Sequence, residues 1–129
     1  YGSTLRLVEK AAIELENLNI NIEIIDLQTL IPFDNDLIIK KSLKKTNKLF
    51  IVDEDLPGGA SSYILQKVIE DQNAFEFLDS KPITLTSKAH RPAYGSDGDY
   101  FSKPSVDDII EKANYIMNEY DPENYPEIF

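Results

Sequence analysis

The chain has 129 residues, of which 42% are hydrophobic and 28% charged, a composition typical of one globular domain rather than of a disordered chain. Thirteen basic and 23 acidic residues give a net charge of −10, which disfavours nucleic acid as a partner and favours a basic one. The absence of cysteine excludes disulfides, thiolate metal sites and a cysteine nucleophile. The longest apolar runs, such as Leu49 to Val52, are far too short to cross a bilayer, so we expect a cytoplasmic protein without membrane contact.

The first predicted element is a helix. Apolar residues from Leu5 to Leu15 recur at helical spacing, and either Ser3 or Thr4 suits the N-cap. Isoleucines then alternate with polar residues, which predicts a strand over 20–27. Asp34 follows as a suitable cap for the next helix, whose apolar residues lie between 37 and 43.

The middle of the chain predicts a buried strand, a turn and a further helix. Leu49 to Val52 are all apolar, as in a parallel strand covered on both faces. The acidic loop Asp53–Gly59 follows, and a helix is expected to begin near Ala60. The paired glycines Gly58 and Gly59 favour a tight turn with positive φ or close packing at Gly59 over an anion site.

The last part predicts one more strand and one more helix. Alternation over 83–86 indicates the strand, and a long loop over 89–104 follows. Residues 106–117 carry the most regular helical stripe, with Ser105 as its N-cap. Residues 118–129 form an acidic, aromatic tail without lysine or arginine.

Alternating helices and strands predict an α/β fold, a three-layer sandwich with a mostly parallel sheet. Residues 1–129 are read as a single domain. In such folds a strand normally precedes a helix that opens on a turn like Gly2-Ser3-Thr4, so we expect the chain to be a fragment of a larger one that lacks its first strand.

Motifs for independent chemistry are weak. The chain lacks G-x-S-x-G and both glycine-rich nucleotide fingerprints. The lone His90 favours a structural role, and Gly95–Asp99 favours a turn over a calcium loop. Asp53 to Asp55, with Asp26 and Lys88, superficially match a magnesium-binding receiver domain. A receiver-like or phosphate-binding regulatory module is therefore kept as the alternative function.

Two segments carry a family resemblance. Ile25–Asp34 and Val52–Ala60 resemble the C-terminal domain of transketolase-like enzymes, most closely the beta part of thiamine-diphosphate 2-oxo acid dehydrogenases. The stretch Lys88–Pro104 resembles a bacterial subgroup in which the alpha and beta parts are fused. The matching positions imply structural roles only, for strand exit and helix start at Asp26, Pro32 and Asp34 and for the second turn at Glu54, Gly58 and Gly59.

The resemblance implies what the parent enzyme does. It oxidatively decarboxylates a 2-oxo acid on thiamine diphosphate with magnesium and passes the acyl group to a lipoyl acyltransferase. Branched-chain 2-oxo acids are the first guess for the substrate, and pyruvate or acetoin are the alternatives. No catalytic, cofactor or metal residue is assigned to this domain, which is expected to be inactive alone. Its implied partners are the other enzyme domains, a dimer mate and the acyltransferase subunit-binding domain. Docking to that subunit-binding domain is assigned to the tail residues Glu119, Asp121, Glu123, Tyr125, Glu127 and Phe129.

Overall fold

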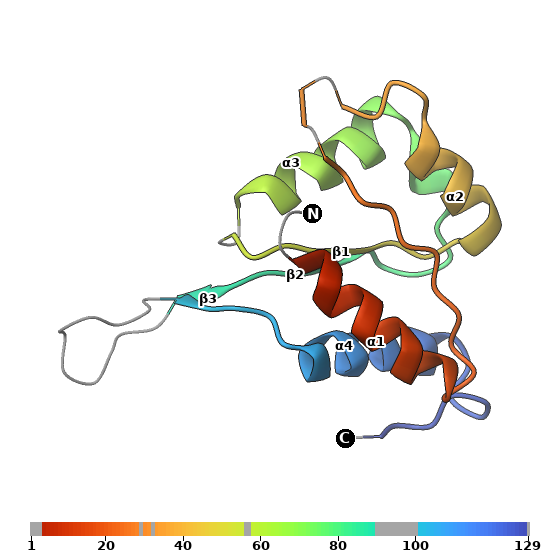
Figure 1. Ribbon diagram of the computed structural model, residues 1–129. Coiled ribbons are helices and arrows are strands. Elements are labelled where there is room, and N and C mark those ends of the chain that lie inside the picture. Colours follow the sequence, from red (N-terminus) through yellow and green to blue (C-terminus); the bar gives the residue numbers. More distant parts are fainter. Residues whose placement is uncertain (1–3, 29, 32, 56–57, 90–100, 129) are drawn as a thin grey trace, which may run out of the picture.

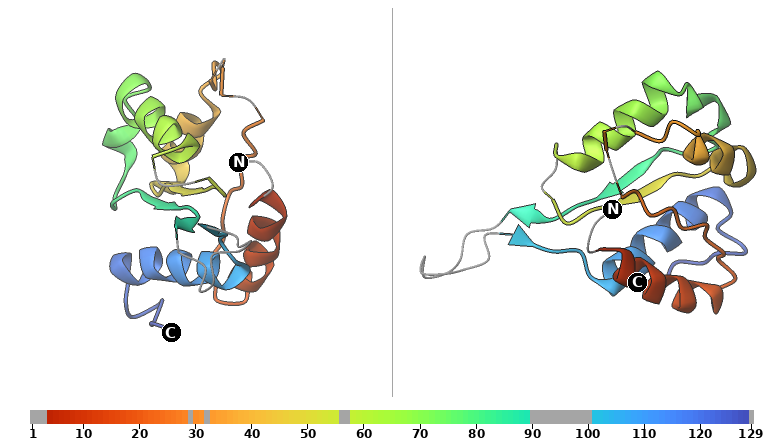
Figure 2. Two further views of the ribbon diagram at one scale, coloured as in Figure 1. Left: turned by 90° about the vertical axis from the view of Figure 1, so that its left-hand side faces the viewer. Right: turned by 45° about the horizontal axis from the view of Figure 1, so that its top comes forward.

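The computed structural model describes residues 4–28, 30–31, 33–55, 58–89 and 101–128. Its elements form three layers, as predicted (Figure 1). A small parallel sheet lies in the middle, helices α1 and α4 cover one face, and α2 and α3 cover the other (Figure 2). The α/β prediction is confirmed. Among the described residues, no helix has both the length and the apolar character needed to cross a bilayer.

The central sheet pairs two strands that come from distant parts of the sequence. Strand β1 is Phe50–Val52 and strand β2 is Ile83–Leu85, and they are parallel with Phe50 opposite Ile83. The crossover between them contains α3, Ala60–Gln66, which continues as a π-helical turn over Lys67–Asp71. The helix that was expected near Ala60 is therefore present.

The outer helices lie where hydrophobic periodicity predicts them, and each extends one to three residues beyond the predicted end. Helix α1 is Leu5–Glu16, α2 is Ile38–Thr46 and α4 is Val106–Tyr120. Ser105 caps α4 as expected, since its hydroxyl accepts from the Asp108 N–H at 3.1 Å and its own N–H donates to the Asp108 carboxylate at 3.0 Å. The long loop before α4 carries a short antiparallel ribbon at its ends, β3 (Lys88–Ala89) with β4 (Phe101–Ser102).

Two apolar clusters lie on opposite faces of the sheet. Val52 and Leu85 point into the cluster that includes Leu15 of α1 and Ile109 of α4. Ile51 points to the other side, into the cluster built by α2 and α3 around Leu43, Ile64 and Val68. Alternation along β1 thus places apolar side chains on both faces, as expected for a strand between two helical layers.

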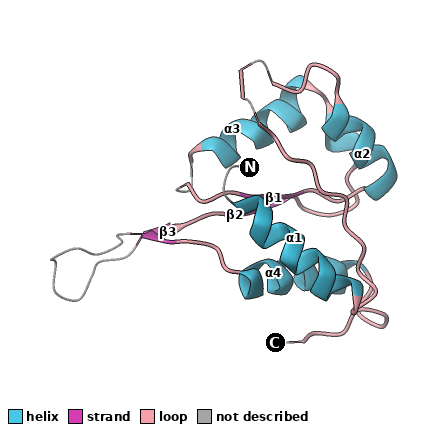
Figure 3. Cartoon of the chain, in the orientation of Figure 1, coloured by secondary structure: helices cyan, strands magenta, loops and turns pink. Residues whose placement is uncertain are grey.

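One local prediction is wrong, and another is confirmed in position only. The strand expected over 20–27 is a loop that pairs with no described strand (Figure 3), although its isoleucines alternate as in a strand. Thr4 occupies the N-cap position of α1, as one of the two expected caps, but its side chain makes no capping hydrogen bond. Its hydroxyl instead donates to the Val52 carbonyl at 3.2 Å, because Thr4 is buried against the end of β1. The alternative cap, Ser3, lies outside the described residues.

Candidate functional site

Asp34 closes the loop that leads into α2. Its carboxylate accepts from the Ile38 N–H at 2.8 Å and from the Ile39 N–H at 3.0 Å, two amides that the first turn of a helix leaves without partners. The Gln72 side-chain amide donates to the same carboxylate at 3.2 Å. Asp34 therefore joins the start of α2 to the end of the α3 layer, which is a structural role.

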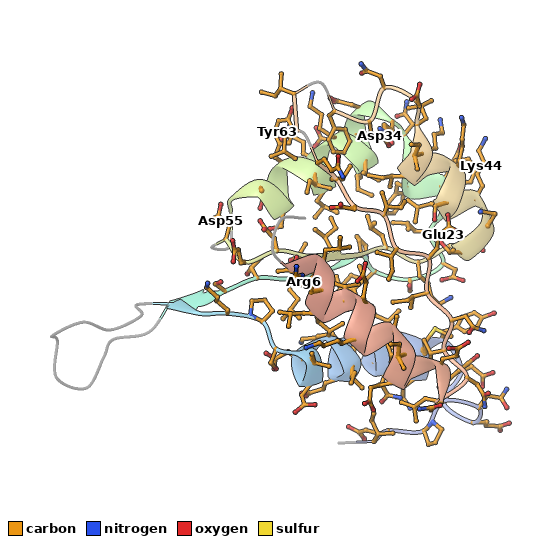
Figure 4. All side chains as sticks on the ribbon, in the orientation of Figure 1. Arg6, Glu23, Asp34, Lys44, Asp55 and Tyr63 are labelled. Atoms are coloured by element: carbon orange, nitrogen blue, oxygen red, sulfur yellow. The ribbon has the colours of Figure 1, made fainter. Side chains whose placement is uncertain are left out.

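The other two residues singled out in the Ile25–Asp34 segment are Asp26 and Pro32. Asp26 is exposed, and its carboxylate accepts from the Gln28 side chain at 3.3 Å. Pro32 lies outside the described residues. The loop is fixed to α3 instead by Tyr63, whose hydroxyl donates to the Leu30 carbonyl at 3.2 Å and whose ring meets Phe33 edge-on (Figure 4). Sequence reasoning missed Tyr63, which gave no signal beyond a helical position.

The carboxyl end of β1 carries the acidic loop. Asp53 is only 2% exposed, and one oxygen of its carboxylate accepts from the Glu54 N–H at 2.8 Å. The other oxygen has no hydrogen-bond partner among the described residues. Burial raises the pKa of Asp53, and the backbone amides of Glu54 and Asp55 oppose that rise only in part. The strand therefore ends on a carboxyl that is costly to ionise.

The neighbouring groups are engaged in structure. Lys103 lies 3.7 Å from the Glu54 carboxylate, and the Ser87 hydroxyl donates to the Glu54 carbonyl. The Ser87 N–H donates to the Asp55 carbonyl at 3.0 Å, so the chain after β2 holds the loop after β1. Ser87 is buried and was not singled out from the sequence, where it is one small polar residue after a strand.

The described acids do not come together as magnesium ligands would. No group of three or more histidine, cysteine, aspartate or glutamate side chains converges within the described part of the chain. The first two acids of the receiver-like arrangement, Asp53 and Glu54, are engaged as above. The Lys88 side chain lies outside the described side chains. His90 and Gly95–Asp99 also lie outside the described residues.

The paired glycines Gly58 and Gly59 have different backbone conformations. Gly58 has φ +91°, a left-handed conformation that favours glycine, and space is open where its Cβ would be. Gly59 has φ −84° and directly precedes α3. Positive φ is therefore found at Gly58 and not at Gly59, whereas close packing at Gly59, the other alternative, stays a prediction.

The acidic tail is folded back beside α4. Asn114 and Asn118 donate their side-chain amides to the carbonyls of Pro126 and Tyr125 at 3.2 and 2.9 Å. Asp121 accepts from the side chain and backbone of Asn124, which lowers the pKa of Asp121. Tyr125 packs against the core cluster of α1 and α4, while Glu119, Glu123 and Glu127 are exposed. Phe129 lies outside the described residues.

Five lysines lie in α2 or just after it, at positions 40, 41, 44, 45 and 48, and several of them have partners. Lys45 pairs with Glu23 at 3.0 Å and thereby lowers the pKa of that carboxyl, and Lys48 pairs with Asp79 at 2.9 Å. Lys40 and Lys44 lie over the Phe77 ring, and Lys44 extends outward from α2 (Figure 4). These contacts indicate a solvated face that also covers Phe77.

Known proteins identify the family. The family model described as transketolase, C-terminal domain, matches residues 1–106. The pyruvate dehydrogenase E1 component subunit beta of Rhizobium meliloti is 33% identical over 117 residues, which are 90% of this chain and 25% of the relative. The protein of the same name from Rickettsia felis is 38% identical over 118 residues, 90% of this chain and 35% of the relative.

A third relative has another substrate in its name. The mitochondrial 2-oxoisovalerate dehydrogenase subunit beta 2 of Arabidopsis thaliana is 38% identical over 71 residues, which are 54% of this chain and 20% of the relative. The chain thus spans about a third or less of the length of these relatives, which are beta subunits of 2-oxo acid dehydrogenases. By sequence and by fold, it belongs to the transketolase C-terminal domain family.

Proposed function

We propose that this chain is the C-terminal assembly domain of a thiamine-diphosphate-dependent 2-oxo acid dehydrogenase. The family match over residues 1–106, together with the names of the relatives, carries the proposal. Pyruvate replaces the branched-chain acids as the favoured substrate, because the relatives from Rhizobium meliloti and Rickettsia felis, each aligned over 90% of the chain, are named for pyruvate. Branched-chain 2-oxo acids become the alternative, supported by the shorter match to the 2-oxoisovalerate enzyme. The fused alpha and beta arrangement stays a prediction.

The described residues support a role in assembly rather than in the chemical step. Thiamine diphosphate supplies the electron sink for decarboxylation in such enzymes, and the protein positions it. In this domain the candidate acids are engaged otherwise: Asp34 caps α2, Asp53 accepts a backbone amide and Glu54 faces Lys103. We therefore assign cofactor and magnesium binding to other domains of the parent enzyme and its dimer mate.

The acidic tail is the proposed docking surface for the lipoyl acyltransferase subunit-binding domain. Its three exposed glutamates present negative charge from a segment that the Asn114 and Asn118 hydrogen bonds hold in place. A fixed acidic surface suits a basic partner, because its charges accelerate encounter and lose little entropy on binding. Tyr125 holds the tail to the core in this proposal and does not serve as an exposed anchor.

The enzymatic part is tested with the full-length polypeptide that contains this chain, together with its partner subunit. We expect decarboxylation that depends on thiamine diphosphate and magnesium, with pyruvate preferred to 3-methyl-2-oxobutanoate. Preference for the branched-chain acid would correct the substrate, and inactivity on every 2-oxo acid would overturn the function. Calorimetry on the 129-residue chain is expected to detect no thiamine diphosphate binding, and micromolar affinity would refute the assembly role.

The docking part is tested by neutralising three acids at each of two places, so that net charge changes equally in both variants. Glu119→Gln, Glu123→Gln and Glu127→Gln together are expected to slow association with the acyltransferase and to weaken its salt dependence. The matched control neutralises Asp36, Glu70 and Glu76 in the α2 and α3 layer, with the same change in net charge. Asp121 is left unchanged because it holds Asn124. Equal association rates for the two triple variants would exclude the tail as the docking surface.

A further inference from the structure

Lys48 lies where three parts of the chain meet. It follows α2 by two residues, and its ammonium donates to both oxygens of the Asp79 carboxylate, at 3.0 and 2.9 Å. The same ammonium lies 3.7 Å from the centre of the Tyr120 ring, at the end of α4. One lysine thus joins the chain after α2, the loop before β2 and the last residue of α4.

The pair of Lys48 with Asp79 is more shielded from solvent than the neighbouring pair of Lys45 with Glu23. The side chain of Lys48 is 17% exposed, whereas that of Lys45 is 67% exposed. The backbone also holds the first pair together, since the Asp79 N–H donates to the Asn47 carbonyl at 2.9 Å. Because solvent and salt screen a shielded pair less than an exposed one, the Lys48 ammonium is held in a fixed position.

The contacts that hold the acidic tail use neutral groups of the tail. The ring of Tyr120 meets Lys48, and backbone carbonyls of the tail accept from side-chain amides of α4. The three exposed glutamates of the tail, at 119, 123 and 127, form no ion pair within the part of the chain that the structure describes. Lys48 is paired with Asp79, so it adds no unpaired positive charge beside them. The tail is therefore held in place while its negative charge stays available to a partner.

We propose that Lys48 is a positioning residue of the docking surface: together with Asp79 it holds the Tyr120 ring and fixes where the tail leaves α4. Tyr120 lies between Glu119 and Asp121, so holding its ring restrains the backbone that carries the first docking glutamate. A surface that is already ordered loses less entropy on binding, and its partner dissociates more slowly. The inference rests on the proposed docking function and adds a residue outside the tail on which that function depends.

The test uses the full-length polypeptide with its partner subunit, and the acyltransferase subunit-binding domain is the probe. Lys48→Met removes the ammonium and keeps most of the length of the side chain. We expect the probe to dissociate at least threefold faster, because the tail is less ordered before binding. Lys45→Met removes the same charge from the exposed pair with Glu23 and is the matched control, with an unchanged dissociation rate. Both variants are expected to show the same salt dependence of association, because neither alters a charge of the tail.

Substitutions at Tyr120 separate the ring contact from general destabilisation. Tyr120→Leu is expected to speed dissociation as much as Lys48→Met does, whereas Tyr120→Phe keeps the ring and is expected to retain most of the slow dissociation. The double variant of Lys48→Met with Tyr120→Leu is expected to lose no more than either single variant, because both changes remove the same contact. Losses that add in the double variant would overturn the role assigned to this contact.

Hydrogen exchange without the probe distinguishes failure of this inference from failure of the docking function. In the Lys48→Met enzyme, amides over 121–128 are expected to exchange at least threefold faster than in the unsubstituted enzyme, while those of β1 keep their rates. Unchanged exchange in the tail would overturn the positioning role of Lys48, and so would an equal acceleration in β1, which indicates a global loss of stability. Faster exchange in the tail with unchanged docking would instead refute the docking function.

Discussion

The strand β1 and the segment over 20–27 differ less in sequence than in structure. Both carry β-branched and other apolar residues and both were predicted as strands, but among the described residues only β1 is paired. Ile51 in β1 is 7% exposed, whereas Ile24 in the other segment is 37% exposed. The difference teaches that alternation measures suitability for a sheet, while a strand forms only where a neighbouring backbone supplies hydrogen bonds.

The largest expected effect contrasts the two segments directly. Ile51→Ala is expected to lower the free energy of unfolding by about 3 kcal/mol, because the side chain is buried against α2 and α3. Ile24→Ala is expected to cost less than about 1 kcal/mol, since much of that side chain is already in contact with solvent. Urea denaturation of both variants measures the difference, and equal losses would contradict the comparison.

A smaller effect is expected where the unpaired segment rejoins the folded layer. Asp34→Ala removes the acceptor of the Ile38 and Ile39 amides and is expected to destabilise the chain by about 1 to 2 kcal/mol. Asp36→Ala, two residues on and exposed, is the control and is expected to change stability by less than about 0.5 kcal/mol. If circular dichroism thermal melts show equal losses for both, Asp34 is not the cap.

Next in size is the contact between α1 and the end of β1. Thr4→Val keeps the shape of the side chain but removes the hydroxyl that donates to the Val52 carbonyl. We expect a loss of about 1 kcal/mol, typical of one buried hydrogen bond. Thr4→Ser, which retains the hydroxyl, separates this loss from that of packing. A Val variant as stable as the parent would remove the evidence that Thr4 marks the edge of β1.

The smallest expected effect is a gain in stability on replacing Asp53, at the end of β1. Burial raises the pKa of Asp53, so the folded chain holds that proton more tightly than the unfolded chain does. The fold is thus favoured below the ordinary pKa of aspartate and loses this contribution as the pH rises through the raised pKa. Asp53→Asn is expected to add about 0.5 kcal/mol at pH 7 and little at pH 3. Urea titrations at both pH values, with Asp36→Asn as control, test the sign.

Local patterns predicted much of the fold because their causes are local. The stripe over 106–117 and the cap at Ser105 gave α4, and the apolar run at Leu49 to Val52 gave the central strand. The pairing of the segment over 20–27 was not predictable in the same way, because it depends on a neighbouring strand. The same contrast between local and distant causes holds for the candidate site. Asp34 was found from its position before a helix, whereas Tyr63 and Ser87 act on loops distant in sequence and left no local signal.

Amide hydrogen exchange tests the comparison between β1 and the segment over 20–27 most directly. The Ile51 and Asp53 amides point toward β2 and are expected to exchange slowly. The Ile24 amide, in a segment that pairs with no described strand, is expected to exchange at least tenfold faster than that of Ile51. An Ile24 amide that exchanges as slowly as that of Ile51 would contradict the account.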